Sequence, residues 1–182
     1  MISREEAYKL VVEKVKQKNL IKHILAVEAV MRRLAQHLGE DVELWGLTGL
    51  LHDLDYSVTA EDPEKHTFIT ADWLKEYELP EELLHAIHAH PGHIPCATKL
   101  DWALFCSDPV TGLIVAGVLM HPSKKLAYID TGYMIRRFKE KRFAAGANRD
   151  NISKCEKLDL PLEEYMGLAI EAMQSISSEL GF

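Results

Sequence analysis

An adjacent histidine and aspartate, His52-Asp53, lie inside an apolar stretch that runs from Leu44 to Leu54. A neutral imidazole and a carboxylate are both ligands of divalent metals, and binding such an ion is their best-known joint role. Leucines at positions 44, 47, 50, 51 and 54 have helical spacing. Neighbours on a helix point about 100° apart, so both side chains can converge on one ion at the helix edge. The pair therefore predicts a metal site whose other ligands come from elsewhere in the chain.

Four further residues with ligand chemistry fall on faces that are predicted to point inward. His23 and His66 each belong to the apolar stripe of a predicted helix, and His90 lies on the apolar face of another. Asp108 lies in an apolar run, where burial of an unpaired carboxylate would be costly. Any one of them alone is usually a hydrogen-bonded core residue or a helix cap. One metal centre satisfies them together, and we predict the ligands His23, His52, Asp53, His66, His90 and Asp108.

The other histidines are predicted to lie outside this group. His37 is near the C-terminus of a predicted helix, where the helix dipole explains it. His93 and His121 fall in loops beside prolines, while His85 and His88 point away from the apolar face of their helix. We expect these four side chains to face solvent.

Almost every segment has the pattern of a helix, and no alternating run long enough for a strand persists. The expected fold class is all-α, a helical bundle, and the length suits a single domain over residues 1–182. Within it we expect a metal-binding helical core, 1–123, and a C-terminal helical extension packed on it, 124–182. The predicted helices are 3–18, 19–38 ending at Gly39, 41–54, 63–77, 80–90, 98–120 with a bend or restart at Pro109, 132–143, 148–158 and 161–180.

The composition is that of a soluble globular protein, with 47% hydrophobic and 27% charged residues. No signal peptide is visible, and the apolar run Leu113–Met120 is too short to cross a bilayer, so we expect no membrane partner. Cys96, Cys106 and Cys155 are odd in number and form no CxxC pair, which favours reduced thiols and a cytoplasmic location.

Charge is distributed unevenly along the chain. The net charge of −7 indicates no general affinity for nucleic acid, so we expect no nucleic acid polymer as a partner. Residues 124–157 nevertheless carry 10 Lys and Arg against 4 Asp and Glu, counted from the sequence. This stretch either binds an anionic substrate, through Lys124, Lys125 or Arg142, or is a solvated basic helix face.

The order His23, His52-Asp53, Asp108 resembles the signature of the HD-domain superfamily of metal-dependent phosphohydrolases. The similarity covers most of the chain and is closest to a small branch of HD hydrolases. The segments that carry it are 50–56, 63–66, 86–90, 108–113, 122–125 and 142–146.

The resemblance implies a role for each ligand. His23, His52, Asp53 and Asp108 match the ligands of the superfamily's first metal, while His66 and His90 match those of a second ion that Asp53 bridges. Two-metal members commonly have another histidine directly after the His90 position. Pro91 stands there in this chain, which leaves His93 as the candidate substitute. Many nucleotidase members also have a glutamate at position 56, which is tyrosine here, so Asp55 is the nearest acid.

The implied function is metal-dependent hydrolysis of a small phosphorylated substrate, such as a nucleotide. The ligand types favour a divalent transition metal (Mn, Fe, Ni, Co or Zn) in one site, with a possible second site. Asp53 and Asp55 are the expected catalytic carboxylates: Asp55, on the helix face of His52, would accept a proton from the attacking water or orient it, unless it is a solvent-facing carboxylate at the helix end. Two alternatives stay open, a two-iron oxygenase of the HD type and a non-catalytic nucleotide sensor.

Overall fold

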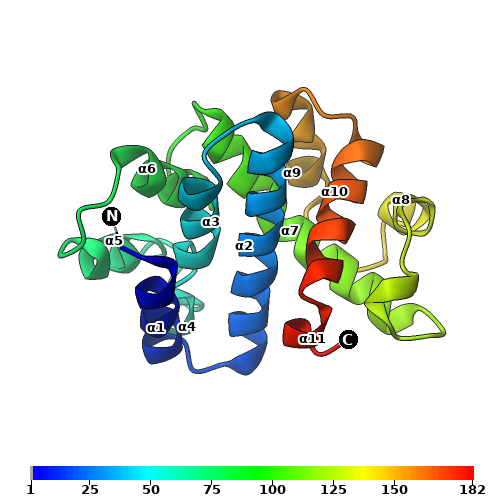
Figure 1. Ribbon diagram of the computed structural model, residues 1–182, viewed down its shortest axis with the longest axis horizontal. Helices are drawn as coiled ribbons and strands as arrows, with labels where there is room; N and C mark the ends of the chain where they lie inside the picture. The colour runs from blue at the N-terminus through cyan, green and yellow to red at the C-terminus, as the bar shows by residue number, and fades with distance from the viewer. Residues whose placement is uncertain (1) are drawn as a thin grey trace.

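The computed structural model describes residues 2–182, which form helices joined by turns, with no strand in that range. The predicted all-α bundle is therefore confirmed. Helix α2 (Lys18–Leu38) stands at the centre of the bundle, between α3 (Val42–Leu51) and α10 (Leu162–Ser175), and contacts both (Figure 1). Helix α7 (Lys99–Met120) crosses behind α2 and packs against it.

Shorter elements surround these four helices. On the α3 side lie α1, α4, α5 and α6, and on the α10 side lies α8 (Figure 1). The bounds are α1 (Arg4–Lys14), α4 (Tyr56–Thr59), α5 (Phe68–Leu74), α6 (Glu81–Ala89), α8 (Thr131–Lys139), α9 (Arg149–Ser153) and α11 (Ser177–Leu180), with 3₁₀ turns at Leu126–Tyr128 and Lys154–Leu158.

Local sequence explains where the main helices begin and end. Ser3 closes a capping box on α1 and Thr98 closes one on α7, so each satisfies backbone N–H groups that have no partner within the helix. Asp41 accepts hydrogen bonds from the first turn of α3. Gly39 ends α2 with a φ of 71°, a left-handed conformation that glycine adopts without steric cost.

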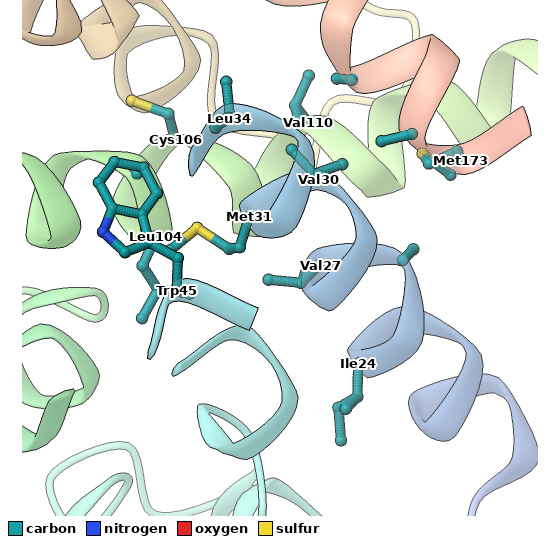
Figure 2. Packing of buried hydrophobic residues seen from close by; sticks show 14 of the residues in the cluster. Ile24, Val27, Val30, Met31, Leu34, Trp45, Leu104, Cys106, Val110 and Met173 are labelled. Atoms are coloured by element: carbon teal, nitrogen blue, oxygen red, sulfur yellow. The ribbon is translucent and has the colours of Figure 1, made fainter. Parts of the chain in front are cut away.

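The core lies where α2 meets its three large neighbours. Figure 2 shows side chains from one face of α2 packed towards α3, α7 and α10, and all of those it labels are buried. Gly49 on α3 permits close packing, because a Cβ atom there would lie 3.0 Å from the Cα of Glu28 on α2. The labelled core residues are Ile24, Val27, Val30, Met31, Leu34, Trp45, Leu104, Cys106, Val110 and Met173.

Several predicted helices differ in the structure, and the final one, 161–180, is interrupted at Ile176 between α10 and α11. The predicted helix 63–77 begins only at Phe68, because Thr67 has a φ of 71° and the residues before it form turns. His66 therefore lies in a turn rather than on a helix stripe. In contrast, α7 continues through Pro109 without a break. Smaller shifts occur at helix ends: α1 stops at Lys14, and α2 starts at Lys18 rather than after an Asn19 cap.

Helix α7 is long and apolar enough, by length and composition, to cross a membrane. It has 22 residues, its most apolar window has a mean hydropathy of 1.8, and 56% of that window is buried inside this fold. Core helices of soluble proteins pass the same test. The sequence predicted this helix over 98–120, but the expectation about membrane crossing considered only the uninterrupted apolar run Leu113–Met120. The division of the domain near residue 123 stays a prediction.

Candidate metal centre

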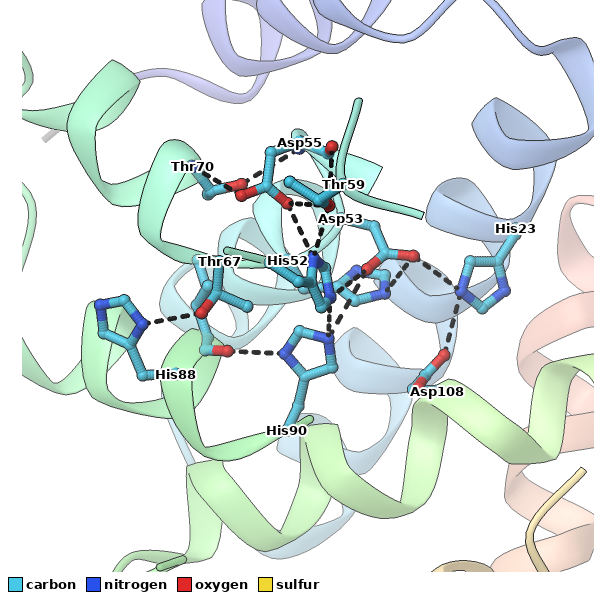
Figure 3. Close-up of polar contacts among 12 residues, drawn as sticks. His23, His52, Asp53, Asp55, Thr59, Thr67, Thr70, His88, His90 and Asp108 are labelled. Carbon is cyan, nitrogen blue, oxygen red and sulfur yellow. Dashed lines mark hydrogen bonds and ion pairs between the residues drawn. The ribbon is translucent and has the colours of Figure 1, made fainter. Parts of the chain in front are cut away.

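The structure brings all of the predicted ligands to one place, from five different parts of the fold (Figure 3). Two of the histidines directly follow the ends of helices α3 and α6, and one lies in the turn before α5. The first aspartate lies in the turn after α3, and the remaining two residues come from α2 and from the middle of α7. In chain order the residues are His23, His52, Asp53, His66, His90 and Asp108.

The Asp53 carboxylate lies between two pairs of imidazoles. Its Oδ2 atom is 3.6 Å from His23 Nε2 and 3.4 Å from His52 Nε2. Its Oδ1 atom is 3.3 Å from His66 Nε2 and 3.6 Å from His90 Nε2. Each carboxylate oxygen therefore faces a different pair of nitrogen ligands, which is the arrangement required of a carboxylate that bridges two ions.

Asp108 extends the pair on the α2 side into a set of three. Its Oδ1 atom is 3.1 Å from His23 Nε2. Ligand atoms of His23, His52 and Asp108 all lie within 4.8 Å of one another, and so do those of His52, Asp53 and His90. Each set is compact enough to surround a single metal ion.

Three of the imidazoles are held in one tautomer by their Nδ1 atoms. Nδ1 of His52 and Nδ1 of His90 lie 2.8 and 2.6 Å from the backbone carbonyl oxygen three residues earlier, and a carbonyl can only accept. Nδ1 of His66 donates to Asp55 Oδ1 at 2.7 Å. With the proton on Nδ1, the lone pair sits on Nε2 and points into the centre, which is how metal-binding histidines are usually oriented.

His23 has the same orientation through a less direct contact. Its Nδ1 atom is 3.1 Å from the Thr111 hydroxyl oxygen, and that hydroxyl donates to the Asp108 carbonyl at 3.0 Å. Because the hydroxyl has only one proton, its oxygen must accept from His23 Nδ1. The His23 Nε2 lone pair is thus also free to bind a metal.

One buried atom in the centre has no partner without a metal. His52 is fully buried, and its Nε2 atom makes no hydrogen bond to residues 2–182. An unsatisfied buried polar atom is costly, and a cation would satisfy this lone pair. Imidazole nitrogens combined with carboxylates suit a divalent transition metal. The residues therefore fit the kind of cofactor that the sequence predicts.

The carboxylates of the centre stay ionised and the protons collect on particular histidines. Burial raises the pKa of Asp53, but His52, His66 and His90 outweigh it and hold this pKa well below its usual range. Burial lowers the pKa of His66, but Asp53 and Asp55 outweigh it and raise the pKa to about 9. Burial alone dominates for His90 and lowers its pKa. A metal that binds here would displace a proton from His66.

Asp55 lies one layer behind the metal ligands. It is fully buried, its Oδ1 atom accepts from His66, and its Oδ2 atom accepts from the Thr70 backbone N–H at 2.9 Å. It therefore does not face solvent, contrary to one of the two expectations for this residue, and it does not line the cavity above the ligands. Helix α3 ends at Leu51, so position 55 no longer shares the helix face of His52.

His88 and His93 are not solvent-facing, as we had expected them to be. His93 Nε2 donates to the His66 carbonyl at 2.9 Å, and His88 Nδ1 lies 2.8 Å from the Thr67 hydroxyl. Both rings pack against Phe68, with centroids 5.0 and 4.9 Å from its ring. The two histidines support the turn that carries His66, and His93 does not replace the ligand that is missing at Pro91.

The remaining histidines also have local partners. His85 and His121, which we expected to face solvent, are half-buried: His85 Nδ1 is 3.1 Å from Asp101 Oδ2, and His121 Nδ1 is 2.7 Å from Ser123 Oγ. His37 lies 3.2 Å from Glu164 on α10, an ion pair that the sequence did not indicate. These residues lie outside the centre, as predicted.

The cations predicted to bind substrate do not reach the metal centre. Lys124, Lys125 and Arg142 are exposed, and none of them lines a cavity that His23 also lines. Lys22 does line such a cavity, between α2, α7 and the C-terminal residues. The sequence reasoning missed Lys22 because it sought cations only in the basic stretch, although Lys22 directly precedes a ligand.

Comparison with protein families matches residues 20–125 to the HD domain, which is more than half of the chain. The chain therefore belongs to the HD domain family, as its resemblance suggested. The matched segment contains every one of the converging ligands.

Similar curated proteins share a name. Ribonuclease Y of Nitratidesulfovibrio vulgaris (strain DP4) is 34% identical over 94 residues, which are 52% of this chain and 18% of that protein. Ribonuclease Y of Staphylococcus epidermidis (strain ATCC 35984) is 35% identical over 93 residues, 51% of this chain and 18% of that protein. The similarity thus spans less than a fifth of the length of these relatives. The comparison with solved structures found no match.

These relatives correct one expectation. We had excluded a nucleic acid polymer as a partner from the net charge of −7, yet proteins named Ribonuclease Y act on RNA by their name. The exclusion is therefore wrong. Net charge describes the whole chain, whereas a metal centre brings its own positive charge to the site where a phosphate would bind.

Proposed function

We propose that this chain is a metal-dependent phosphohydrolase that cleaves phosphodiester bonds, with RNA as the first substrate to test. The observation that carries the proposal is the position of Asp53, whose two carboxylate oxygens face two different pairs of imidazoles. Membership of the HD domain family and the name of the relatives support the same chemistry.

The charge of the centre favours two ions over one. Asp53, Asp55 and Asp108 carry three negative charges when ionised, and no lysine or arginine lines the cavity above the ligands. One divalent ion at His23, His52 and Asp108 would leave His66 protonated and the centre neutral, which gives a phosphodiester no net attraction. Two divalent ions would leave one positive charge, which attracts it. The second ion, at His66 and His90, therefore belongs to the proposal.

The chain itself has to hold the ions and present the substrate to them. Bound divalent ions would polarise a phosphoryl oxygen and activate water for attack on phosphorus. Asp55 and the carbonyls behind the imidazoles keep the ligands oriented, so little reorganisation is required on binding. Asp108 and His23 are the ligands nearest to solvent, with side chains 37% and 24% exposed, so substrate would enter from their side.

Tyr56 is a second residue that meets incoming substrate. It lines the cavity above the ligands, is 44% exposed, and places its ring edge-on to His66 at a centroid distance of 5.5 Å. An aromatic ring in this position offers a surface on which a base can stack. Family resemblance had marked this position only as the site of a missing glutamate.

Elemental analysis of the purified protein, followed by a hydrolysis screen, tests the proposal. The screen adds each of Mn, Fe, Ni, Co and Zn to metal-free protein and offers a short oligoribonucleotide, methyl p-nitrophenyl phosphate and p-nitrophenyl phosphate. We expect diester cleavage with at least one metal, and loss of both metal and cleavage in His52→Ala. His37→Ala, on the far part of α2, is the control. Absence of diester cleavage with every metal would overturn the proposal.

The second candidate function is a two-iron oxygenase. The same observation favours it, since a carboxylate shared by two sets of histidine ligands also suits a pair of irons. The metal content separates the two functions: two irons per chain with an electron paramagnetic signal and oxygen uptake would favour the oxygenase. Tight nucleotide binding without turnover under any metal would instead favour the sensor.

A further inference from the structure

A second cavity opens from the metal centre towards the C-terminal part of the chain. It has a volume of about 430 Å³, similar to the 420 Å³ of the cavity above the ligands, and the two share His23 and Asp108. Helix α7 forms its floor, including Gly112, and the segment 144–151 forms its opposite wall. We call it the α7–α9 cavity. The wall formed by residues 144–151 lies outside the matched HD domain, which ends at residue 125.

The walls of the α7–α9 cavity combine open surface with unpaired amides. No atom lies within 4 Å of the point where a Cβ atom would stand on Gly112 or on Gly146. Asn148 uses its Oδ1 atom to cap α9, and neither its amide N–H groups nor the Asn151 side chain forms a hydrogen bond with residues 2–182. Flat surface beside amide donors and acceptors is what a base or a sugar requires.

Arg149 holds the wall of the cavity in place. The segment from Glu140 to Ala147 turns without a regular helix after α8, so it lacks most of the backbone hydrogen bonds that a helix would supply. Arg149 donates to the Ala144 carbonyl at 2.6 Å and to the Ala147 carbonyl at 2.8 Å, and also bonds to those of Phe138, Glu140 and Phe143. Ala144 itself has a φ of 44°, a strained conformation that persists only where the surroundings impose it.

We propose that the α7–α9 cavity is the subsite for the nucleoside on one side of the scissile phosphodiester. Asn148 and Asn151 contact its base or sugar, and Arg149 is a positioning residue that shapes the wall. The inference rests on the proposed function, because His23 and Asp108 line both cavities, and a phosphate bound at the metal centre beside them would leave one neighbouring nucleoside in this cavity. The cavity that contains Lys22 shares only His23 with the cavity above the ligands, so it is the less direct continuation.

The experiment compares a substrate that fills the subsite with one that does not. For each variant we measure kcat/KM for a diribonucleotide and for methyl p-nitrophenyl phosphate, whose methyl arm is too small to use the cavity. Gly112→Leu places a side chain in the open space, and Asn151→Leu removes an amide while preserving size. We expect kcat/KM for the diribonucleotide, divided by kcat/KM for methyl p-nitrophenyl phosphate, to fall about tenfold in each variant. This is the effect of one lost hydrogen bond or one steric block.

Two further variants sharpen the result. Asp150→Asn changes the residue next to Asn151 without touching the cavity lining, so both substrates should be cleaved as by the unmodified protein. Arg149→Met should raise KM for the diribonucleotide with little change in kcat, because it loosens a binding wall and not the ligands. A general loss of folding would instead lower kcat for both substrates.

Calorimetric binding of a phosphorothioate-linked diribonucleotide separates this inference from the proposed function. If the protein cleaves no diester but binds this probe, and Gly112→Leu and Asn151→Leu weaken binding about tenfold, the subsite stands and the proposed function fails. If the protein cleaves both diesters with an unchanged ratio in every variant, the function stands and the subsite is overturned. Lack of binding by the unmodified protein also overturns the subsite.

Discussion

The two sets of candidate ligands are held in place by different forces. His23, His52 and Asp108, the helix set, lie on or directly after α2, α3 and α7, whose packed faces form the core. His66 lies in a turn whose next residue has a φ of 71°, and that turn depends on hydrogen bonds with the side chains of Asp55, His88 and His93. With His90 it forms the turn set. Hydrophobic packing thus positions one set, and polar contacts position much of the other.

The comparison indicates how sensitive metal binding by each set should be to substitutions away from the ligands. Buried helices resist the loss of a single hydrogen bond, because many apolar contacts hold each ligand in place. A turn held by polar contacts has fewer other contacts to keep it in place when one hydrogen bond is removed. Each removed partner also leaves a buried polar group unsatisfied. Substitutions away from the ligands should therefore affect metal binding by the turn set more than by the helix set.

Removal of the shared carboxylate should have the largest effect, because it abolishes the distinction between the two sets. Asp53→Ala takes away the oxygen that faces each set and leaves four imidazoles close together. We expect loss of both ions and at least about a hundredfold loss of hydrolysis. Metal content by elemental analysis and diester cleavage are measured together. Retention of one ion per chain would show that the sets are independent and that Asp53 does not bridge.

Single-ligand variants sharpen the comparison. His23→Ala should remove the ion of the helix set and spare that of the turn set, while His66→Ala should do the reverse, so that each variant retains about one of two ions. Spectroscopic titration with Co²⁺ follows each site separately. If both variants lose all metal, the centre has a single ion that uses ligands from both sets.

The role of Asp55 can be decided by its effect on metal and on turnover. Asp55→Ala removes the partner of His66 Nδ1 and leaves the Thr70 backbone N–H buried without an acceptor. We expect metal affinity of the turn set to fall roughly 10- to 100-fold and the protein to lose about 2–3 kcal/mol of stability. An unchanged metal affinity with a reduced kcat would instead restore the catalytic role that the sequence suggested for Asp55.

The packing of α2 against α3 provides the matching test for the helix set. A Cβ atom on Gly49 would meet the Glu28 backbone at 3.0 Å, so Gly49→Ala must push the two helices apart and move His23 away from His52. We expect a destabilisation of about 1–3 kcal/mol, measured by urea unfolding. Gly112→Ala is the control, because its Cβ atom meets nothing within 4 Å and alanine favours a helix. Equal stability of the two variants would contradict the importance of this close approach.

The sequence predicted which residues converge better than it predicted what holds them in place. His23, His52 and Asp108 interrupt clear apolar periodicity, so their inward position follows from helix geometry. His66 was selected for the same reason, although it lies in a turn and not on a helix face. The left-handed conformation of Thr67 left no signal in the residue pattern, since threonine rarely adopts it. The positions of the side chains that contact this turn, those of Asp55, His88 and His93, could therefore not be predicted from the sequence.

The smallest expected effect comes from a residue that supports the turn without contacting the ligand side chain. His88→Ala removes one hydrogen bond, to the Thr67 hydroxyl, and part of the packing against Phe68. We expect a loss of about 0.5–1.5 kcal/mol in stability and a fall of only a few-fold in metal affinity of the turn set. His121→Ala, which removes a similar contact beyond the end of α7, is the control for stability alone. If both variants retain equal metal affinity, His88 is not required for the turn. Only the hydrogen bonds with Asp55 and His93 would then position His66.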